Sequence, residues 1–134
     1  MEQKQNNLPK EKDPKLQEYR EFVLGLESTK DEEVKTRLDH AISGLVTEAG
    51  ELTGLMKKIK FAKATIPRIN FLDEAGDLFW YFIVMLNVFG VTLEDIARLN
   101  TTKLKTRYPT GYTNREALEK DKDLEKERME EESI

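Results

Sequence analysis

Two short motifs each place a pair of carboxylates three residues apart, within apolar stretches that have the periodicity of a helix. They are Glu48-Ala49-Gly50-Glu51 and Glu74-Ala75-Gly76-Asp77. Three residues along an α-helix correspond to a rise of about 4.5 Å and an angular offset of roughly 60°, so both carboxylates of a pair project from one face. Each pair can therefore reach one small, hard cation.

The segment that contains the first motif has the most regular pattern in the chain. Its apolar residues repeat alternately by four and three, which is typical of the seam of a helical bundle. The seam consists of Leu38, Ile42, Leu45, Ala49, Leu52, Met56 and Ile59, and a second stripe beside it of Ala41, Gly44, Glu48, Glu51 and Leu55. We therefore expect Glu48 and Glu51 to be half-buried at the edge of a core. Glycines 44, 50 and 54 each cost about 1 kcal/mol in a helix, which predicts close packing against this backbone.

Capping signals mark the other helices. Asp13-Pro14 predicts the start of a first helix, and Asp31 is the expected cap of the second. A third helix is expected from about residue 69 to residue 87, with Gly90 as its C-cap. Thr92 with Asp95 resembles a capping box for a fourth helix. These signals predict an all-α fold of four to five helices packed as a bundle.

The expected organisation is one domain with charged ends. Residues 1–12 are polar and are interpreted as a flexible N-terminus, residues 13–113 as the helical domain that contains both acidic motifs, and residues 114–134 as a charged C-terminal helix or tail. This tail holds nine acidic and five basic residues and few large apolar ones, so we expect it to be solvated, to fray and to add little to the core or site.

Composition excludes several classes of protein. Residues 1–113 carry seventeen acidic and seventeen basic residues, which argues against nucleic-acid binding through bulk charge. The chain has no cysteine, which excludes disulfides and thiolate metal sites and is consistent with the cytoplasm. No signal peptide is recognisable at the N-terminus. The apolar run from Leu78 to Phe89 is too short for a membrane span, so we expect burial by the bundle and by a second copy of the chain.

The four acids of the two motifs predict a metal site. Half-buried carboxylates that face one another resist ionisation unless a cation neutralises them, and oxygen ligands favour Mg²⁺, with Mn²⁺ as the alternative. A di-iron carboxylate bundle would require Glu-x-x-His motifs, and the chain has a single histidine, His40. The same shortage argues against Ser/His/Asp and Cys/His catalysis. The remaining alternative is that the acids are solvated residues of helix faces.

Two groups of basic residues suit phosphate oxygens. Asn100, Lys103 and Arg107 follow one another at spacings of three and four along the expected fourth helix. Five further cations, without an acid among them, precede the expected third helix: Lys57, Lys58, Lys60, Lys63 and Arg68. Exposed basic residues are common on helices and loops, so a solvated face is the alternative interpretation of both groups.

With these residues assembled, the chain resembles the MazG-like nucleoside triphosphate pyrophosphohydrolases, particularly the compact forms common in phages. Three blocks carry the resemblance: residues 44–52 (GLVTEAGEL), residues 70–81 (NFLDEAGDLFWY) and residues 100–109 (NTTKLKTRYP). It implies the family's all-α fold and a homo-oligomer, dimer or tetramer, located in the cytoplasm, that of the host if a phage encodes the chain.

The resemblance also implies the chemistry. Glu48, Glu51, Glu74 and Asp77 would bind magnesium and act in catalysis. The substrate would be bound by Asn100, Lys103, Arg107 and Tyr108. A nucleoside triphosphate, or a related nucleotide, would be hydrolysed at the α-phosphorus to a monophosphate and pyrophosphate, because a metal ion activates water and neutralises charge on phosphoryl oxygens.

One residue departs from the family pattern. The pattern often reads Glu-Glu-x-x-Glu, and its first position is Thr47 here. Threonine cannot act as a general base, so another carboxylate or metal-activated water takes this role, or the activity is weak. A second hypothesis, a non-catalytic helical binding or assembly module that retains the fold, would need the apolar seams but not four convergent acids. The sequence leaves the preferred base and sugar open.

Overall fold

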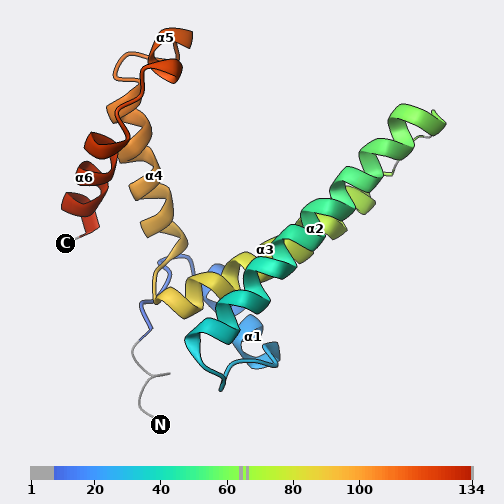
Figure 1. The fold of residues 1–134 in the computed structure, drawn as a ribbon. Coiled ribbons are helices and arrows are strands. Elements are labelled where there is room, and N and C mark those ends of the chain that lie inside the picture. The colour runs from blue at the N-terminus through green and yellow to red at the C-terminus, as the bar shows by residue number, and fades with distance from the viewer. Residues whose placement is uncertain (1–7, 64, 66, 134) are drawn as a thin grey trace. The chain divides into compact units, whose positions relative to one another are not determined.

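The computed structural model describes residues 8–63, 65 and 67–133, and these residues form helices without a strand (Figure 1). The expected all-α fold is confirmed. The helices divide into two compact units at Gly90, with α1 to α3 in the first and α4 to α6 in the second. No single helix among the described residues is both long enough and apolar enough to cross a bilayer.

Helix α1 (Pro14–Leu26) begins where its capping signal predicts. The Asp13 carboxylate accepts hydrogen bonds from the backbone N–H groups of Lys15 and Leu16, at 2.8 and 3.1 Å. These bonds satisfy two donors that have no partner within the helix, and Pro14 lacks a donor at the first position. The N-terminus of α1 is therefore fixed by local sequence.

The segment before α1 is packed at Glu11, in contrast to the flexible N-terminus expected there. Arg20 donates to the Glu11 carboxylate at 2.7 Å, and both side chains are buried. The same guanidinium donates to the Asn87 side-chain oxygen on α3 at 2.7 Å. The Arg20 guanidinium can be buried here because a carboxylate and an amide oxygen accept its hydrogen bonds. Residues 1–7 lie outside the described part of the chain.

Helix α2 (Val34–Ala62) is capped by Glu33, so the prediction that Asp31 caps it was wrong. Asp31 lies in the preceding turn. That turn is held by Glu27, whose buried carboxylate accepts two hydrogen bonds from Arg37 at 2.7 and 2.9 Å. Glu33 itself makes no side-chain hydrogen bond to the helix, so the contact that ties the start of α2 to the preceding turn is this pairing between residues ten apart.

Helices α2 and α3 (Arg68–Phe89) form an antiparallel hairpin, visible as the long green and yellow pair in Figure 1. The face of α2 that meets α3 is its second stripe, in which Ala41, Gly44 and Leu55 are buried. The expected seam is largely open: Ile42 is 51% exposed and Met56 53% exposed. The prediction that the seam faces the core of the chain was therefore wrong.

Close packing explains why the second stripe faces inward. A Cβ atom added at Gly44 would overlap the ring of Tyr81, so only glycine allows α3 to approach α2 at this point. A Cβ at Gly50 or Gly54 would meet nothing within 4 Å. The close packing predicted from the three glycines is thus present at Gly44 and absent at the other two within the described chain.

The second unit contains α4 (Leu93–Arg107), α5 (Asn114–Leu118) and α6 (Lys122–Ser133). The predicted capping box is confirmed, since Thr92 and Asp95 exchange hydrogen bonds of 2.9 and 3.0 Å. Gly90, just before this unit, ends α3 in the left-handed conformation with φ 64°, as expected of a glycine C-cap.

The C-terminal segment is more structured than its composition predicts. Helix α6 packs along α4, and Glu125 on α6 is only 4% exposed (Figure 1). Its carboxylate accepts two hydrogen bonds from Arg107, both 2.7 Å long. The expected charged helix is present and most of its residues are exposed, but Glu125 is packed against α4, where a charge partner compensates for the buried acid.

Candidate metal centre

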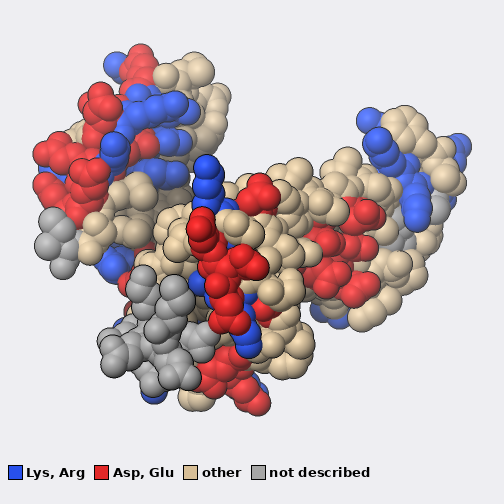
Figure 2. Space-filling view, turned by 60° about the horizontal axis from the view of Figure 1, so that its bottom comes forward, with Lys and Arg blue, Asp and Glu red and all other residues tan. Residues whose placement is uncertain are grey.

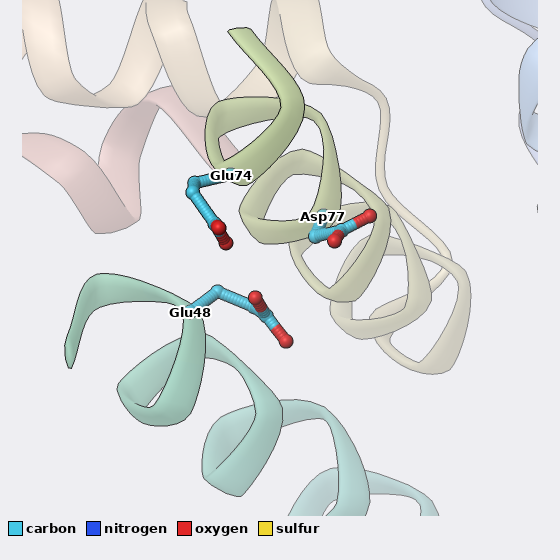
Figure 3. A group of neighbouring side chains, drawn as sticks. All are labelled: Glu48, Glu74 and Asp77. Carbon is cyan, nitrogen blue, oxygen red and sulfur yellow. The ribbon is translucent and has the colours of Figure 1, made fainter. Parts of the chain in front are cut away.

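Three of the four predicted acids come together between α2 and α3. Glu48 projects from α2, and Glu74 and Asp77 project from α3, with the Glu48 and Glu74 carboxylates facing each other in Figure 3. One carboxylate oxygen from each of the three residues lies within 4.8 Å of the other two. We call these three residues the acid cluster. The hairpin brings them together because the two motifs lie on packed faces of antiparallel helices.

The acid cluster has no internal counter-charge. None of its three carboxylates forms an ion pair in the part of the chain that the structure describes. Burial raises the pKa of Glu48 above its ordinary value, and the neighbouring charges of Asp77 and Glu74 raise it further. Like charges held this close oppose ionisation, so a bound cation would stabilise the ionised cluster.

The donor set fits a small divalent cation. Mg²⁺ binds oxygen ligands at about 2.0–2.1 Å in an octahedron, so the ligand oxygens lie about 3 to 4.2 Å from one another. The oxygens of the acid cluster lie within 4.8 Å of one another, and small rotations of exposed or half-buried side chains would close the difference. The site contains neither the nitrogen nor the sulfur ligands that zinc prefers.

Glu51 lies outside this group. It is exposed on α2, although its charge contributes to the raised pKa of Glu48, so it is close to the cluster. Thr47, the residue that departs from the family pattern, donates its hydroxyl to the Ser43 carbonyl at 3.0 Å. That hydroxyl is occupied by its own helix, so the structure gives Thr47 no direct role in the cluster.

Aromatic side chains surround the acids, and the sequence analysis did not assign them to the site. Tyr19 of α1 stacks on Phe79, with ring centroids 5.4 Å apart. Burial raises the pKa of Tyr19, and the charge of Asp77 contributes, which places this phenol near the cluster. His40 contacts Trp80 and Tyr81 on the next turns of α3. The sequence signal that could have indicated these residues was the aromatic run Phe79-Trp80-Tyr81, which begins two residues after Asp77.

The four residues predicted to bind substrate belong to the second unit. Asn100 is exposed, and Lys103 and Tyr108 are half-buried. Arg107 ends α4, and its guanidinium carbon lies 5.7 Å from the centre of the Tyr108 ring. The Arg107 side chain is held by Glu125, a partner eighteen residues away that no local spacing indicated.

The second group of cations occupies the far end of the α2–α3 hairpin. Figure 2 shows acidic residues gathered along the hairpin and basic residues at its end. All five members, Lys57, Lys58, Lys60, Lys63 and Arg68, are exposed. Nothing in the described structure joins them to the acid cluster, so they are treated as a separate, solvated group.

The structure thus shows an all-α hairpin with three convergent acids that could hold a metal ion. A model of the MazG nucleotide pyrophosphohydrolase domain matches residues 37–112, more than half of the chain. The chain belongs to this family. It is also 33% identical over 78 residues to the Gene 37 protein of Mycobacterium phage L5, covering 55% of this chain and 68% of that protein. No solved structure is significantly similar to the chain.

Proposed function

We propose that the protein is a magnesium-dependent nucleoside triphosphate pyrophosphohydrolase, which converts an NTP, a dNTP or a related nucleotide to its monophosphate and pyrophosphate. The observation that carries this proposal is the acid cluster of Glu48, Glu74 and Asp77, which lies within the segment matched by the family model. An assembly module would need packed helices but no convergent, uncompensated carboxylates.

In this proposal the three carboxylates of the acid cluster hold the cation, and Mn²⁺ is the expected substitute for Mg²⁺. The ion would neutralise charge that develops on the phosphoryl oxygens and lower the pKa of water. The protein's own residues hold the substrate: Asn100, Lys103, Arg107 and Tyr108 are proposed to bind the phosphates. An amide, an ammonium group and a guanidinium along one helix suit a polyphosphate chain.

Glu51 is included among the catalytic acids, and its position outside the cluster makes its role testable. If Glu51 is a metal ligand, Glu51→Gln weakens Mg²⁺ binding and turnover together. If it orients the attacking water in place of Thr47, the same change leaves metal binding intact and lowers turnover alone. Isothermal titration with Mn²⁺ beside steady-state kinetics distinguishes these roles.

The decisive experiment is release of pyrophosphate from a panel of canonical, deoxy, oxidised and signalling nucleotides, with Mg²⁺ and after chelation. We expect at least one nucleotide to yield its monophosphate and pyrophosphate in equal amounts, only when metal is present. Release of single phosphates, or turnover unaffected by chelation, would contradict the proposed reaction. A lack of turnover across the panel, with the fold intact, would favour the binding-module alternative.

We also propose that the working form is a homo-oligomer, dimer or tetramer, in the cytoplasm. Support comes from α2, where Val46 is 69% exposed beside Ile42 and Met56 of the open seam. The apolar run of α3, by contrast, is mostly buried or half-buried within the chain, except for Phe89. Sedimentation at micromolar concentration should show a species larger than 15.6 kDa. A Val46→Glu chain should sediment as the monomer, and a wild-type monomer would exclude the oligomer.

A further inference from the structure

The ion pair between α4 and α6 joins a residue proposed to bind substrate to one without an assigned role. Arg107 donates from Nε to Oε1 of Glu125 and from Nη2 to Oε2, both at 2.7 Å. The Glu125 side chain is 5% exposed and that of Arg107 17% exposed. Two parallel hydrogen bonds between planar groups fix the guanidinium in both direction and rotation.

The pair is strongly favoured in its charged form. The hydrogen bonds from Arg107 lower the pKa of Glu125, and the charges of Lys103 and Lys120 lower it further. Glu125 in turn raises the pKa of Arg107. Buried ion pairs add little stability compared with apolar residues of similar size. The arrangement is better explained by what it does to the direction of the arginine than by stability alone.

The bonds to Glu125 leave one edge of the guanidinium available. An arginine has five N–H donors, and Glu125 accepts one from Nε and one from Nη2. The remaining three, two on Nη1 and one on Nη2, form another edge, beside the Tyr108 side chain, which also contributes to the raised pKa of Arg107. This edge can hold a second anion. One arginine can therefore bind a carboxylate on one edge and a phosphate group on the other.

The surroundings indicate from which side a phosphate would arrive. The hollow beside Arg107 at α5 contains one further cation, Lys120, but acids outnumber it: Glu116, Glu119 and Asp121 also line the hollow and would repel an anion. Lys103 lies one turn earlier on α4 and is close enough to Glu125 to lower the pKa of that carboxyl. The approach along the α4 stripe is therefore the electrostatically favourable one.

We propose that Glu125 is a positioning residue for substrate binding: it holds the Nε edge of Arg107 so that the other edge faces a phosphate group beside Lys103. This proposal rests on the proposed function, in which Arg107 binds the phosphates of the nucleotide. It makes α6 part of the substrate-binding machinery. A matched control exists on the same helix, because Glu127 is an exposed acid two residues further on.

The test uses the full chain with Mg²⁺ and measures binding of sodium tripolyphosphate by titration calorimetry, together with kcat and KM for the best nucleotide of the panel. For Glu125→Gln we expect tripolyphosphate binding to weaken about 3- to 10-fold, because a free arginine must be ordered on binding. KM should rise by a similar factor, with kcat changed less than 2-fold. Glu127→Gln should leave both quantities at the wild-type value.

The direction of the effect separates positioning from simple electrostatics. Removing a negative charge near a phosphate site should tighten anion binding if charge alone matters. Tighter or unchanged binding by Glu125→Gln would therefore overturn the proposal, and tighter binding would identify Glu125 as a competitor for Arg107. A wild-type chain that does not bind tripolyphosphate would overturn it as well.

A second variant covers the case in which Glu125→Gln loses helix, as judged by circular dichroism. The exchange Arg107→Glu with Glu125→Arg keeps an ion pair between α4 and α6 but moves the guanidinium to α6. We expect this chain to fold and to lose tripolyphosphate binding as fully as Arg107→Ala does. Wild-type binding by the exchanged chain would overturn the proposal.

The outcomes also separate this proposal from the proposed function. If no nucleotide is hydrolysed but tripolyphosphate binding depends on Glu125 as expected, only the proposed reaction fails. If nucleotides are hydrolysed and Glu125→Gln binds tripolyphosphate as tightly as the wild type, only the positioning role fails.

Discussion

The acid cluster and the α4–α6 pair use the same chemical group in opposite environments. In the acid cluster, burial and two neighbouring carboxylates raise the pKa of Glu48. Between α4 and α6, the bonds from Arg107 lower the pKa of Glu125, although this residue is the more buried of the two. The difference shows that burial alone does not mark a functional acid. The acid cluster differs from Glu125 in lacking a cationic partner within the described structure, and this difference supports the proposed metal site.

The largest expected effect concerns the acid cluster, whose carboxylates form no ion pair in the described structure. Replacing Glu48, Glu74 or Asp77 by its amide should lower turnover at least about 100-fold and weaken metal binding, because the ion supplies several kcal/mol of transition-state stabilisation. Variants with two of these replacements should have a turnover little below that of the single variants, since the effects of replacing residues that act as one unit are not additive. Kinetics and Mn²⁺ titration measure both quantities.

Asp73→Asn is the matched control, because Asp73 is an exposed acid beside Glu74 on α3. It should retain wild-type turnover. The metal-free amide variants should be at least as stable as the wild type, because like-charge repulsion is relieved. Near-wild-type turnover in all three variants, or unfolding of all three, would contradict the metal-site interpretation.

The next largest effect compares two basic residues of α4, Lys103 and Arg107. No ion pair of Lys103 was found in the described structure, in contrast to Arg107. Lys103→Ala should therefore lower kcat/KM by about 10-fold or more without lowering the melting temperature, since a charge-assisted bond to substrate is lost. Arg107→Ala should lower both, because it also leaves Glu125 buried without its partner. Equal melting losses for the two variants would give Lys103 a structural role.

A smaller effect concerns the support beneath the acid cluster. Gly44→Ala should destabilise the chain by about 1–3 kcal/mol, because the new methyl group would overlap the Tyr81 ring. Gly54→Ala, on an open face of the same helix, should stabilise it by about 1 kcal/mol. Urea unfolding measures both changes. A loss of stability in Gly54→Ala would show that a second copy packs on that face.

The smallest expected effect is that the contributions of Glu48 and Glu125 to folding stability change in opposite directions with pH. A raised pKa means that the folded state binds a proton more tightly than the unfolded one, so the contribution of Glu48 to metal-free stability falls as pH rises from the ordinary glutamate pKa through the raised value. The lowered pKa of Glu125 gives a stabilising contribution that is complete above the ordinary value and is lost as pH falls through the lowered one. Hydrogen exchange of α2 and α6 amides, with Glu48→Gln and Glu125→Gln as references, should show the two trends. Parallel trends would contradict the contrast.

Features encoded by neighbouring residues were predictable from the sequence. The Asp13 cap, the Gly90 C-cap and the Thr92–Asp95 box each depend on atoms within a few residues, and all were confirmed. The carboxylates of Glu48, Glu74 and Asp77 were also predicted to converge, because the spacing within each motif fixes a helix face.

Features that depend on tertiary packing were not predictable in this way. Helix α2 has two apolar stripes, and either could have faced the interior. The stripe that contains Gly44 does so, because Gly44 allows the ring of Tyr81 on α3 to pack closely against it. Glu33, and not Asp31, stands at the N-cap position of α2, next to a turn in which Glu27 pairs with Arg37 ten residues later. The partner of Arg107 lies eighteen residues away on a segment whose composition suggested a solvated tail. Helical periodicity alone carries no information about such partners.

The contact of Tyr81 with Gly44 has a consequence for the choice of ion. Gly44 lies one turn before Glu48, and Tyr81 one turn after Asp77, so in antiparallel helices the aromatic ring occupies the layer next to the acids. Because the ring packs directly on the Gly44 backbone, we expect its thickness to determine the distance between the two helices here, and with it the separation of the carboxylates. Ca²⁺–oxygen bonds are about 0.3–0.5 Å longer than those of Mg²⁺. Tyr81→Leu should therefore reduce the discrimination between the two ions, measured as the ratio of their dissociation constants. Tyr81 would then affect which ion the site prefers without contacting the ion.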